Sequence, residues 1–385
     1  MKKEIFRNTT QCIQNEFCSK NHFDYSLLGG DFGKVLFLYI ASKYNLCEKS
    51  VADDCLNLIL SSIKHRPIIS SYCNGLAGLC VGLNFLEEKH FIEGVSNSID
   101  VYDHYLKGQL RKSIKHNLDF LHGAMGIGFF FILRAQCNDD AYQQVKFILQ
   151  FLDENSYKTK DGCIYWKYPN RFGVNEENLS LSHGICSTAL FISRAYRVLN
   201  SHDRTLSLKL LEGIGRYLMS NLKDPDELGS FTPMFPNNAR SRLGWCYGDI
   251  GTSIALRAIG EITQNPILSQ ASFQIASYTA THRRNLKFNF VNDACLCHGA
   301  SGIAHFFKNC LTYYQDVSFK EAYMWWKNIT LEMYKYVNGK FMFGNFRYDD
   351  SRIHECLNLL EGDAGATLML MDEDELIDNI LLYDY

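Results

Sequence analysis

The sequence carries little net charge, a modest share of charged residues and no long apolar run, and each scarcity excludes a class of protein. The formal net charge is −3 over 385 residues, whereas nucleic-acid-binding proteins gather Lys and Arg on a basic face, so nucleic acid is not an expected partner. Charged residues make up 21% of the chain against 46% hydrophobic residues. This composition excludes extended disorder and provides for a substantial core.

Neither a membrane span nor an export signal is visible. No stretch reaches the roughly 18 uninterrupted apolar residues of a spanning helix. The first ten residues, MKKEIFRNTT, contain two lysines but lack the apolar segment of a signal peptide. We therefore expect a protein that stays in the cytoplasm. Its 14 cysteines should remain reduced there, most of them as small buried residues.

The sequence does contain a glycine-rich turn that occurs seven times, each time before an apolar run. The first glycines of the turns are Gly30, Gly75, Gly123, Gly184, Gly248, Gly299 and Gly362. The spacings between them are 45, 48, 61, 64, 51 and 63 residues, so each interval has room for two helices and two loops. Such a period is typical of repeat proteins and indicates seven helical hairpins within one domain, residues 1–385.

Two kinds of helix are predicted in these repeats. The stretches 127–133 and 189–192, which follow turns, are mostly apolar and suit inner helices buried nearly all round. The segment 206–218 shows apolar residues at helical spacing with charged residues among them, which is typical of an outer helix. The segment 320–337 has the same pattern and stops at Asn338-Gly339, so a helix is predicted there as well.

The predicted fold is all-α, because strand signals are scarce. Two-helix repeats can stack into an open solenoid, which needs polar capping repeats, or close into a ring. The terminal repeats keep apolar inner helices here, which favours a ring. Residues 157–178 break the pattern with a β-like stretch at 163–168 and are predicted to form a small insertion. The acidic segment 371–375 is predicted to be a solvated cap.

The two residues before each first glycine should point to one end of the central cavity if the turns are equivalent. Six of these fourteen positions hold Cys or His: Cys73, His122, His183, Cys246, Cys297 and His298. Cys and His together are 26 of 385 residues, so roughly one is expected by chance. The enrichment indicates coordination chemistry at the turns.

Cys246, Cys297 and His298 are the preferred ligand set for a metal ion. They come from adjacent repeats, and a catalytic zinc site has three protein ligands with a fourth position open to water or substrate. Two thiolates and an imidazole suit zinc better than magnesium or calcium, which prefer oxygen ligands. Cys295 is a rival that spacing does not exclude. A closed structural site would need a fourth ligand, for which the candidates are Cys73, His122 and Cys295.

Three motifs on this frame resemble the lanthionine synthetase C family: Trp245-Cys246-Tyr247-Gly248, Cys297-His298-Gly299 and Leu359-Leu360-Glu361-Gly362-Asp363-Ala364-Gly365. The resemblance spans nearly the whole chain. It implies a seven-fold α,α-toroid, with inner and outer rings of helices around a central zinc ion. It also implies a lanthipeptide cyclase, which adds cysteine thiols of a dehydrated precursor peptide to dehydroalanine or dehydrobutyrine and forms lanthionine or methyllanthionine thioether rings.

The resemblance assigns six residues by position. Cys246, Cys297 and His298 match the family's zinc ligands, and Asp119, His183 and Arg242 match its other active-site residues. Arg242 and His183 are candidates to stabilise the enolate, and His183 is expected to protonate the α-carbon while Asp119 holds its imidazole. The reverse assignment of His183 and Asp119 stays open. One departure is Ser187, which stands where the fourth turn should have its second glycine.

Other interpretations fit the same residues. A relative of the family could add glutathione to dehydroamino acids, using similar zinc chemistry. A zinc prenyltransferase barrel also activates a peptide thiol, although the seven glycine-rich turns disfavour it. A non-catalytic scaffold could hold a dehydratase or a peptide, with zinc tying two repeats together. The family's association with a dehydratase and an export transporter implies a peripheral complex at the inner face of the membrane.

Overall fold

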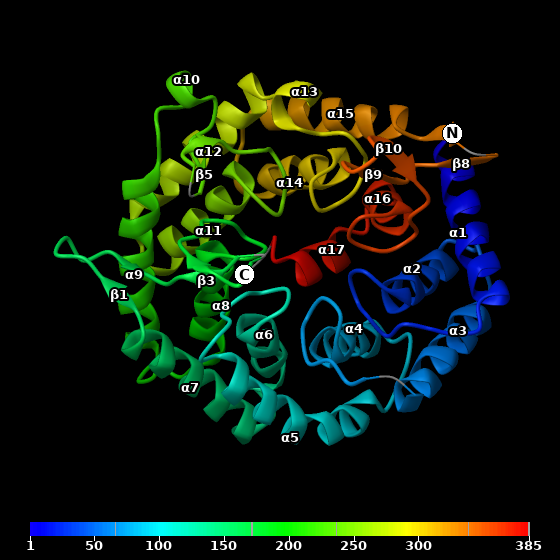
Figure 1. Cartoon of the computed structure of the whole chain (residues 1–385), viewed down its shortest axis with the longest axis horizontal. Helices are drawn as coiled ribbons and strands as arrows, with labels where there is room; N and C mark the ends of the chain where they lie inside the picture. The colour runs from blue at the N-terminus through cyan, green and yellow to red at the C-terminus, as the bar shows by residue number, and fades with distance from the viewer. Residues whose placement is uncertain (66, 171, 236, 338, 384–385) are drawn as a thin grey trace.

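The computed structural model describes residues 1–65, 67–170, 172–235, 237–337 and 339–383 and has two concentric rings of helices (Figure 1). Within these residues, the inner ring consists of α2 (Asp31–Lys43), α4 (Leu76–Glu88), α6 (Ala124–Arg134), α8 (Ile185–Val198), α11 (Asp249–Ile262), α14 (Ala300–Tyr313) and α16 (Asp363–Leu370). Each inner helix has the first glycine of a turn as its N-cap residue. The predicted all-α toroid of helical hairpins is confirmed.

The inner helices are buried because they are apolar on nearly every side. In α6, all residues from Ala124 to Ile132 are buried. The second glycine of a turn lets the chain pack closely: a Cβ atom on Gly302 would lie 1.9 Å from the carbonyl oxygen of Leu296. The fourth turn instead carries Ser187, which is buried and donates its Oγ hydrogen to the carbonyl of Gly184 at 2.8 Å. The hydroxyl of Ser187 is therefore hydrogen-bonded within its own turn.

The outer ring covers these helices with amphipathic ones. It consists of α1 (Lys2–Ser19), α3 (Lys49–Ser62), α5 (Val95–Ser113), α7 (Asp139–Glu154), α9 (Arg204–Asn221), α12 (Pro266–His282) and α15 (Val317–Glu332). The apolar residues that predicted an outer helix at 206–218 lie in α9, and Leu210, Leu211 and Ile214 are fully buried there.

The helix predicted over 320–337 is wrong at its C-terminal end. Helix α15 ends at Glu332, and residues 335–337 form a strand that pairs with residues 340–342. Tyr336 lies directly opposite Phe341, and such aromatic cross-strand pairs stabilise a hairpin. The turn glycine, Gly339, has a φ of 88°, so the Asn-Gly pair marks a hairpin rather than a helix stop; Asn338 itself lies outside the described residues.

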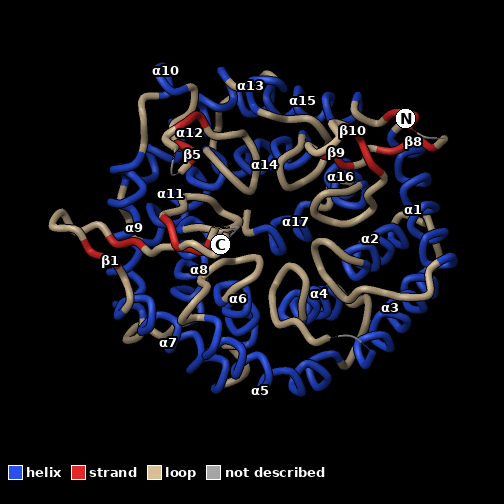
Figure 2. The backbone as a smooth tube through the Cα atoms, viewed as in Figure 1, coloured by secondary structure: helices blue, strands red, loops and turns tan. Residues whose placement is uncertain are grey.

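Short antiparallel hairpins stand on the ring (Figure 2). Their strands are β1 (Tyr157–Lys158), β2 (Ile164–Tyr165), β3 (Tyr168–Pro169), β4 (Asn175–Glu176), β5 (Pro233–Met234), β6 (Ala239–Arg240), β7 (Lys335–Val337), β8 (Lys340–Met342), β9 (Asn345–Arg347) and β10 (Arg352–His354). The segment 157–178 holds β1 to β4, and the β-like stretch 163–168 is divided between two hairpins. Three single-turn helices complete the structure: η1 (Ile63–His65), α10 (Pro225–Leu228) and α13 (Leu286–Asn289).

Backbone hydrogen bonds link the turns around the ring. Each bond joins the residue two before a first glycine to its counterpart in the next turn: Leu28 N to Cys73 O, Cys73 N to Leu121 O, Ser182 N to Cys246 O, Cys246 N to Cys297 O, Cys297 N to Leu360 O, and Leu360 N to Leu28 O, all at 2.8–3.3 Å. The last bond joins the seventh turn to the first. The ring is closed, as its apolar terminal repeats predict.

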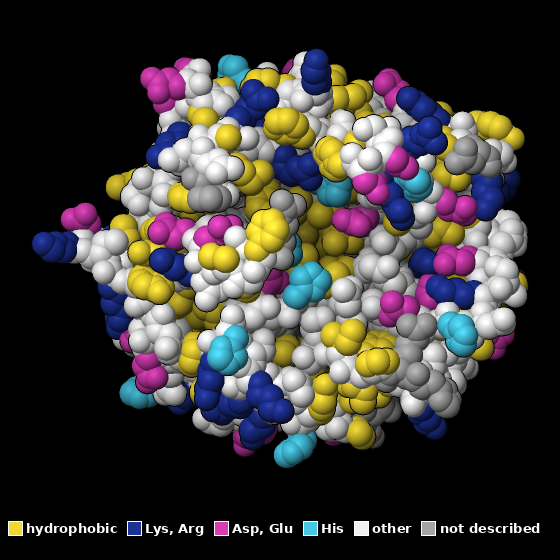
Figure 3. All heavy atoms as spheres, in the orientation of Figure 1, with side chains coloured by type: hydrophobic (Ala, Val, Ile, Leu, Met, Phe, Trp, Pro, Cys, Tyr) yellow, Lys and Arg dark blue, Asp and Glu magenta, His cyan; other side chains and the backbone are white. Residues whose placement is uncertain are grey.

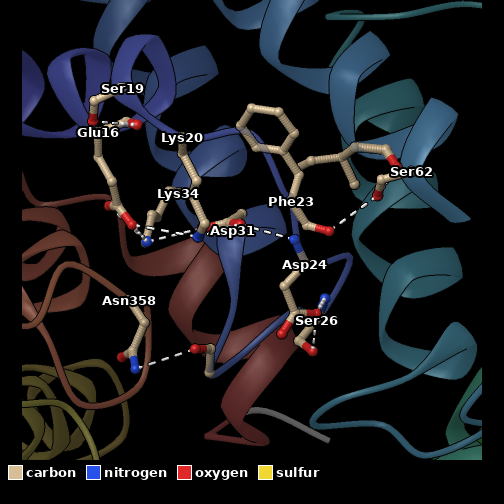
Figure 4. Close-up of polar contacts among 12 residues, drawn as sticks. Glu16, Ser19, Lys20, Phe23, Asp24, Ser26, Asp31, Lys34, Ser62 and Asn358 are labelled. Atoms are coloured by element: carbon tan, nitrogen blue, oxygen red, sulfur yellow. Dashed lines mark hydrogen bonds and ion pairs between the residues drawn. The ribbon is translucent and has the colours of Figure 1, made fainter. Parts of the chain in front are cut away.

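Side chains reinforce the seam where the two ends of the ring meet (Figure 4). Asp31, the first residue of α2, accepts hydrogen bonds from Lys20 at 2.7 Å and from Lys34 at 2.9 Å. Burial alone would raise the pKa of Asp31, but the two cations outweigh it and lower that pKa. Asn358 of the last turn donates to the carbonyl of Gly29 in the first turn at 3.4 Å.

The C-terminal helix α17 (Asp374–Leu381) lies in the middle of the ring (Figure 1). The residues just before two of the turn cysteines are hydrogen-bonded to this helix. The hydroxyl of Tyr72 donates to the carbonyl of Ile380 at 2.9 Å. Nε1 of Trp245 donates to the carbonyl of Leu381 at 2.6 Å. The helix is therefore a central plug beneath the turns.

The acidic segment 371–375 is solvated only in part: the side chains of Asp372 and Glu375 are 48% and 63% exposed, whereas that of Asp374 is 34% exposed. Asp374 forms an ion pair with Lys308 at 2.6 Å. Nε2 of His305, a fully buried residue of α14, lies 2.7 Å from Oδ1 of Asp378 on the plug. These carboxylates tie the plug to the inner ring, a role that charge alone did not reveal. No helix in the described part of the chain is long and apolar enough to cross a membrane.

Candidate metal centre

The fifth and sixth turns bring together the three predicted metal ligands. The backbone bond from Cys246 N to Cys297 O aligns the two turns at 3.2 Å. Sγ of Cys246, Sγ of Cys297 and a ring nitrogen of His298 all lie within 4.8 Å of one another. Both cysteines are nearly inaccessible, at 6% and 8% exposure, and His298 is partly exposed.

The surroundings of this cluster favour one thiolate. A hydrogen bond from Cys297, together with the neighbouring His298 and Arg242, holds the pKa of the Cys246 thiol well below its usual range. The pKa of Cys297 is raised in turn, because its thiol would have to ionise beside the Cys246 thiolate in a buried place. A metal cation bound between these atoms would offset the repulsion between the two thiolates, so that both sulfurs would be ionised.

The residues present fit zinc. Two thiolates and an imidazole are a zinc donor set, and the three atoms lie close enough together that they could hold one ion. A second group, Asp293 with Cys295 and His298, meets the same distance limit. Burial raises the pKa of Cys295 to about 12, and the second group contains no thiol whose pKa is lowered, as that of Cys246 is in the first group. The first group is therefore the better centre.

Two of the candidate fourth ligands are not at either cluster. Among the residues that the structure describes, Cys73 and His122 belong to no group of three with this spacing. Cys295 lies near His298, whose backbone N–H donates to its Sγ at 3.4 Å. A closed four-ligand site would thus need Cys295 as its fourth ligand. Without Cys295, the group of Cys246, Cys297 and His298 leaves one coordination position open.

His183 and Asp119 form a pair on neighbouring turns. Nδ1 of His183 lies 2.5 Å from Oδ2 of Asp119, whose other oxygen accepts from the backbone N–H of His122 at 2.7 Å. Burial alone would lower the pKa of His183, but the bond to Asp119 outweighs it and the pKa is raised. The adjoining Ser182 donates its hydroxyl hydrogen to the carbonyl of Cys246 at 3.1 Å, so this pair borders the metal cluster.

Arg242 lies on the other side of the cluster. Burial lowers its pKa, but the charge of Cys246 raises it further, so the guanidinium stays a cation beside that sulfur. Its Nη2 donates to the hydroxyl of Tyr348 at 2.8 Å, and Nδ2 of Asn292 donates to the same hydroxyl at 3.2 Å. Tyr348 follows β9 and is 59% exposed, so its ring stands at the rim of the site.

Sequence reasoning missed two residues of this site, Tyr247 and Tyr348, and named His122 only as one of the turn residues and a candidate fourth ligand. The ring centroids of Tyr247 and His122 lie 6.1 and 6.0 Å from that of His183. Both residues stand directly before a first glycine, so the turn register that identified His122 could also have identified Tyr247. Tyr348 belongs to no turn, and no signal in the sequence pointed to it.

This fold and this site together define a class of protein, a closed helical toroid whose turns carry an open cluster of thiols and imidazole able to hold zinc. Residues 21–379 match the family described as lanthionine synthetase C-like protein, and the chain belongs to that family. Among solved structures, nisin cyclase has the same fold, with a TM-score of 0.75 at 20% sequence identity over 99% of this chain and 98% of that chain. No curated protein sequence matches the chain significantly.

Proposed function

We propose that this chain is a zinc-dependent lanthionine synthetase, which joins cysteine thiols of a dehydrated precursor peptide to dehydroalanine or dehydrobutyrine within that peptide. The observation that carries the proposal is the open Cys246, Cys297 and His298 cluster beside the His183–Asp119 pair. Membership of the lanthionine synthetase C-like family supports it. The proposal takes residues 1–385 as one toroid domain in which 157–178 is an insertion.

Cys246, Cys297 and His298 would hold the zinc ion, which, when bound, would lower the pKa of a substrate thiol and so supply a nucleophile at neutral pH. The turns surround a hollow in the centre of the face seen in Figure 3, which we call the crater, and the three ligands stand on two adjacent turns. A free cysteine thiol has a pKa near about 8.5 and is mostly protonated at neutral pH, which is why such activation accelerates the reaction.

Thiol addition to the β-carbon places negative charge on the carbonyl oxygen next to the α-carbon. Arg242 is a half-buried, permanent cation beside Cys246 and would stabilise that oxygen. His183 would then deliver its proton to the α-carbon. Asp119 holds the Nδ1 side of the ring at 2.5 Å, so Nε2 is the atom that donates, and the raised pKa of His183 keeps the ring protonated closer to neutral pH.

The partners of this reaction follow from its chemistry. The substrate is a peptide whose Ser or Thr residues have already been dehydrated, so a dehydratase must act first. A product peptide that is exported needs a transporter, and we propose a peripheral complex of the three at the inner face of the membrane. The reaction needs free thiols, which the reducing cytoplasm maintains.

The nearest alternative is addition of glutathione to dehydroamino acids, which the same cluster could perform with a small external thiol. A dehydrated peptide with one cysteine separates the two reactions. Intramolecular cyclisation consumes the thiol at unchanged mass, whereas addition raises the mass by one glutathione.

The first experiment measures zinc content and thiol loss together, in the wild-type protein and in Cys246→Ala. We expect about one zinc ion per chain and loss of peptide thiol at constant mass, both abolished by the substitution. Cys295→Ala is the matched control, because that cysteine is equally buried and lies in the rival group. Zinc lost from Cys295→Ala and retained by Cys246→Ala would overturn the ligand assignment.

A further inference from the structure

Three of the inner helices begin with a buried aspartate: Asp31 in α2, Asp249 in α11 and Asp363 in α16. Each of these carboxylates accepts a hydrogen bond, at 2.7–2.8 Å, from a backbone N–H in the segment that precedes its turn. The aspartate at this position therefore fastens that segment to the start of the inner helix. The three aspartates differ in the charges around them.

Cations neutralise two of these carboxylates but not the third. Asp31 forms ion pairs with two lysines, and Asp249 forms one with Arg283 at 2.8 Å. Asp363 is only 3% exposed, yet no Lys, Arg or His among the described residues forms an ion pair with it. Its hydrogen-bond partners are backbone N–H groups. A buried carboxylate that lacks a cation favours its protonated form.

The titratable groups that face Asp363 do not balance its charge. They are Cys12 of α1, Tyr334 after α15, and Glu355 and Cys356 after β10. Burial raises the pKa of both thiols and of the tyrosine, so these three groups are uncharged near neutral pH. Burial, assisted by the negative charge of Glu355, outweighs the backbone hydrogen bonds and raises the pKa of Asp363 to about 7. This carboxyl therefore gains or loses its proton near neutral pH.

Asp363 holds the two residues that link β8 to β9. Its Oδ1 accepts from the backbone N–H of Gly344 at 2.7 Å, and its Oδ2 accepts from that of Phe343 at 3.2 Å. Gly344 has a φ of 63°, and a Cβ atom there would lie 2.6 Å from the carbonyl oxygen of His354 in β10. This close turn needs both hydrogen bonds. An ionised carboxylate accepts both, whereas protonation turns one oxygen into a donor and weakens its bond to the facing N–H.

Strand β9 connects this turn to the rim of the site. The backbone N–H of Phe346 in β9 donates to Oδ2 of the buried Asp293 at 3.0 Å. Tyr348 follows the strand, and its hydroxyl accepts from Nη2 of Arg242 at 2.8 Å. One short strand thus joins the turn that Asp363 holds to a hydrogen-bond partner of the cation beside the metal cluster.

We propose that Asp363 is a positioning residue for cyclisation, whose ionised carboxylate fixes the β8–β9 turn so that Tyr348 holds Arg242 at the reacting carbonyl. This inference rests on the proposed function, because that function gives Arg242 its role. Loss of the negative charge loosens the turn, so ring formation slows as the pH falls through neutrality. Arg242 itself remains a cation throughout, and only its placement changes.

The first test compares kcat/KM of the wild type with that of Asp363→Asn, which is permanently neutral. Taking the ratio removes the titration of all other groups. We expect a ratio near one at about pH 6 and of about three- to tenfold at about pH 8, the effect of one hydrogen bond. A ratio that does not change with pH contradicts the proposal. Glu355→Gln is the matched control. It removes the charge that helps to raise the pKa of Asp363, so the ratio of its kcat/KM to that of Asp363→Asn should rise at lower pH to the same plateau.

The second test reads the turn without the reaction. Hydrogen exchange of residues 340–348, corrected for the intrinsic rate at each pH, should be slower at about pH 8 than at about pH 6 in the wild type. It should not differ in Asp363→Asn. Tyr348→Phe should keep this pH dependence and lose the activity ratio, because its link to Arg242 is cut. Exchange that is independent of pH in the wild type overturns the proposal, whereas a wild type that cyclises no dehydrated peptide at any pH refutes the proposed function and with it the role of Arg242.

Unfolding gives a third check, which also shows that the variant folds. The pKa of folded Asp363 is raised above its unfolded value, so the folded state binds this proton more tightly. The resulting stability is complete below about pH 4 and is lost as the pH rises through about 7. The wild type should therefore lose stability relative to Asp363→Asn over this range. A difference that is constant with pH would show that Asp363 does not titrate there.

Discussion

Two of the toroid's histidine–carboxylate pairs are alike in chemistry and different in place. His183 and Asp119 lie on turns at the crater, and the His183 side chain is 30% exposed. His305 and Asp378 join an inner helix to the central plug, and His305 is buried. Carboxylates outweigh burial and raise the pKa of both histidines. A shifted histidine is therefore no sign of catalysis by itself; access to a substrate distinguishes the two.

The largest expected effect comes from removing the acid at the crater. His183→Asn should lower kcat by about 10²–10⁴-fold, because it removes general acid catalysis, while zinc content and the midpoint of thermal unfolding change little. Single-turnover kinetics and metal analysis on the same preparation measure this. His305→Asn, the same substitution in the other pair, is the control, and equal loss of kcat in both variants would contradict the comparison.

His305→Asn should act on stability instead. It leaves Asp378 and Asp374 without their partner, at a cost of about 2 kcal/mol, below the roughly 3–5 kcal/mol of a fully buried pair, since Asp378 and Asp374 keep 20% and 34% side-chain exposure. Urea unfolding at neutral pH measures the loss.

This contribution should also depend on pH. The carboxylates of Asp374 and Asp378 outweigh burial and raise the pKa of folded His305 above 6.5, so the folded state binds a proton more tightly than the unfolded state. The stability difference between wild type and His305→Asn should be complete below about pH 6.5 and shrink as pH rises through the raised pKa. A difference that grows with pH would show that His305 is neutral in the folded protein.

The pH profile of cyclisation tests whether Asp119 raises the pKa of His183. Asp119→Asn removes the charge that raises the pKa of His183, so the alkaline limb of kcat should move to lower pH, with a smaller loss of kcat than in His183→Asn. Rate profiles of wild type and variant test this, since an unmoved limb would show that Asp119 does not set the pKa of the group that limits the rate at high pH.

The smallest effect is expected at the rim. Tyr348→Phe removes the hydroxyl that binds Arg242 and Asn292. One hydrogen bond is worth about 0.5–1.5 kcal/mol, so kcat/KM should fall roughly three- to tenfold with no change in zinc content. Tyr336→Phe, an equally exposed tyrosine in a separate hairpin, should have no effect.

The elements that repeat in the sequence were predictable, and those that occur once were not. Gly30 and the six equivalent glycines cap inner helices because each begins an apolar run, and the same register aligned Cys246 with Cys297. The plug escaped prediction because the acidic residues before it resemble any solvated segment; their partners Lys308 and His305 lie far away in the chain. Tyr348 reaches Arg242 across 106 residues, and no local pattern records such a contact.

The backbone hydrogen bonds that join the last turn to the sixth and the first also dictate when the protein can mature. Cys297 is bonded to Leu360, Leu360 to Leu28, and Trp245 to Leu381, so the turns that carry the sulfurs are aligned only after residues near both ends have met. A chain emerging from the ribosome folds its early hairpins first, but its metal cluster stays unformed until translation is nearly finished. A chain that ended before Leu360 would thus lack the hydrogen bonds that join the sixth turn, through the seventh, to the first.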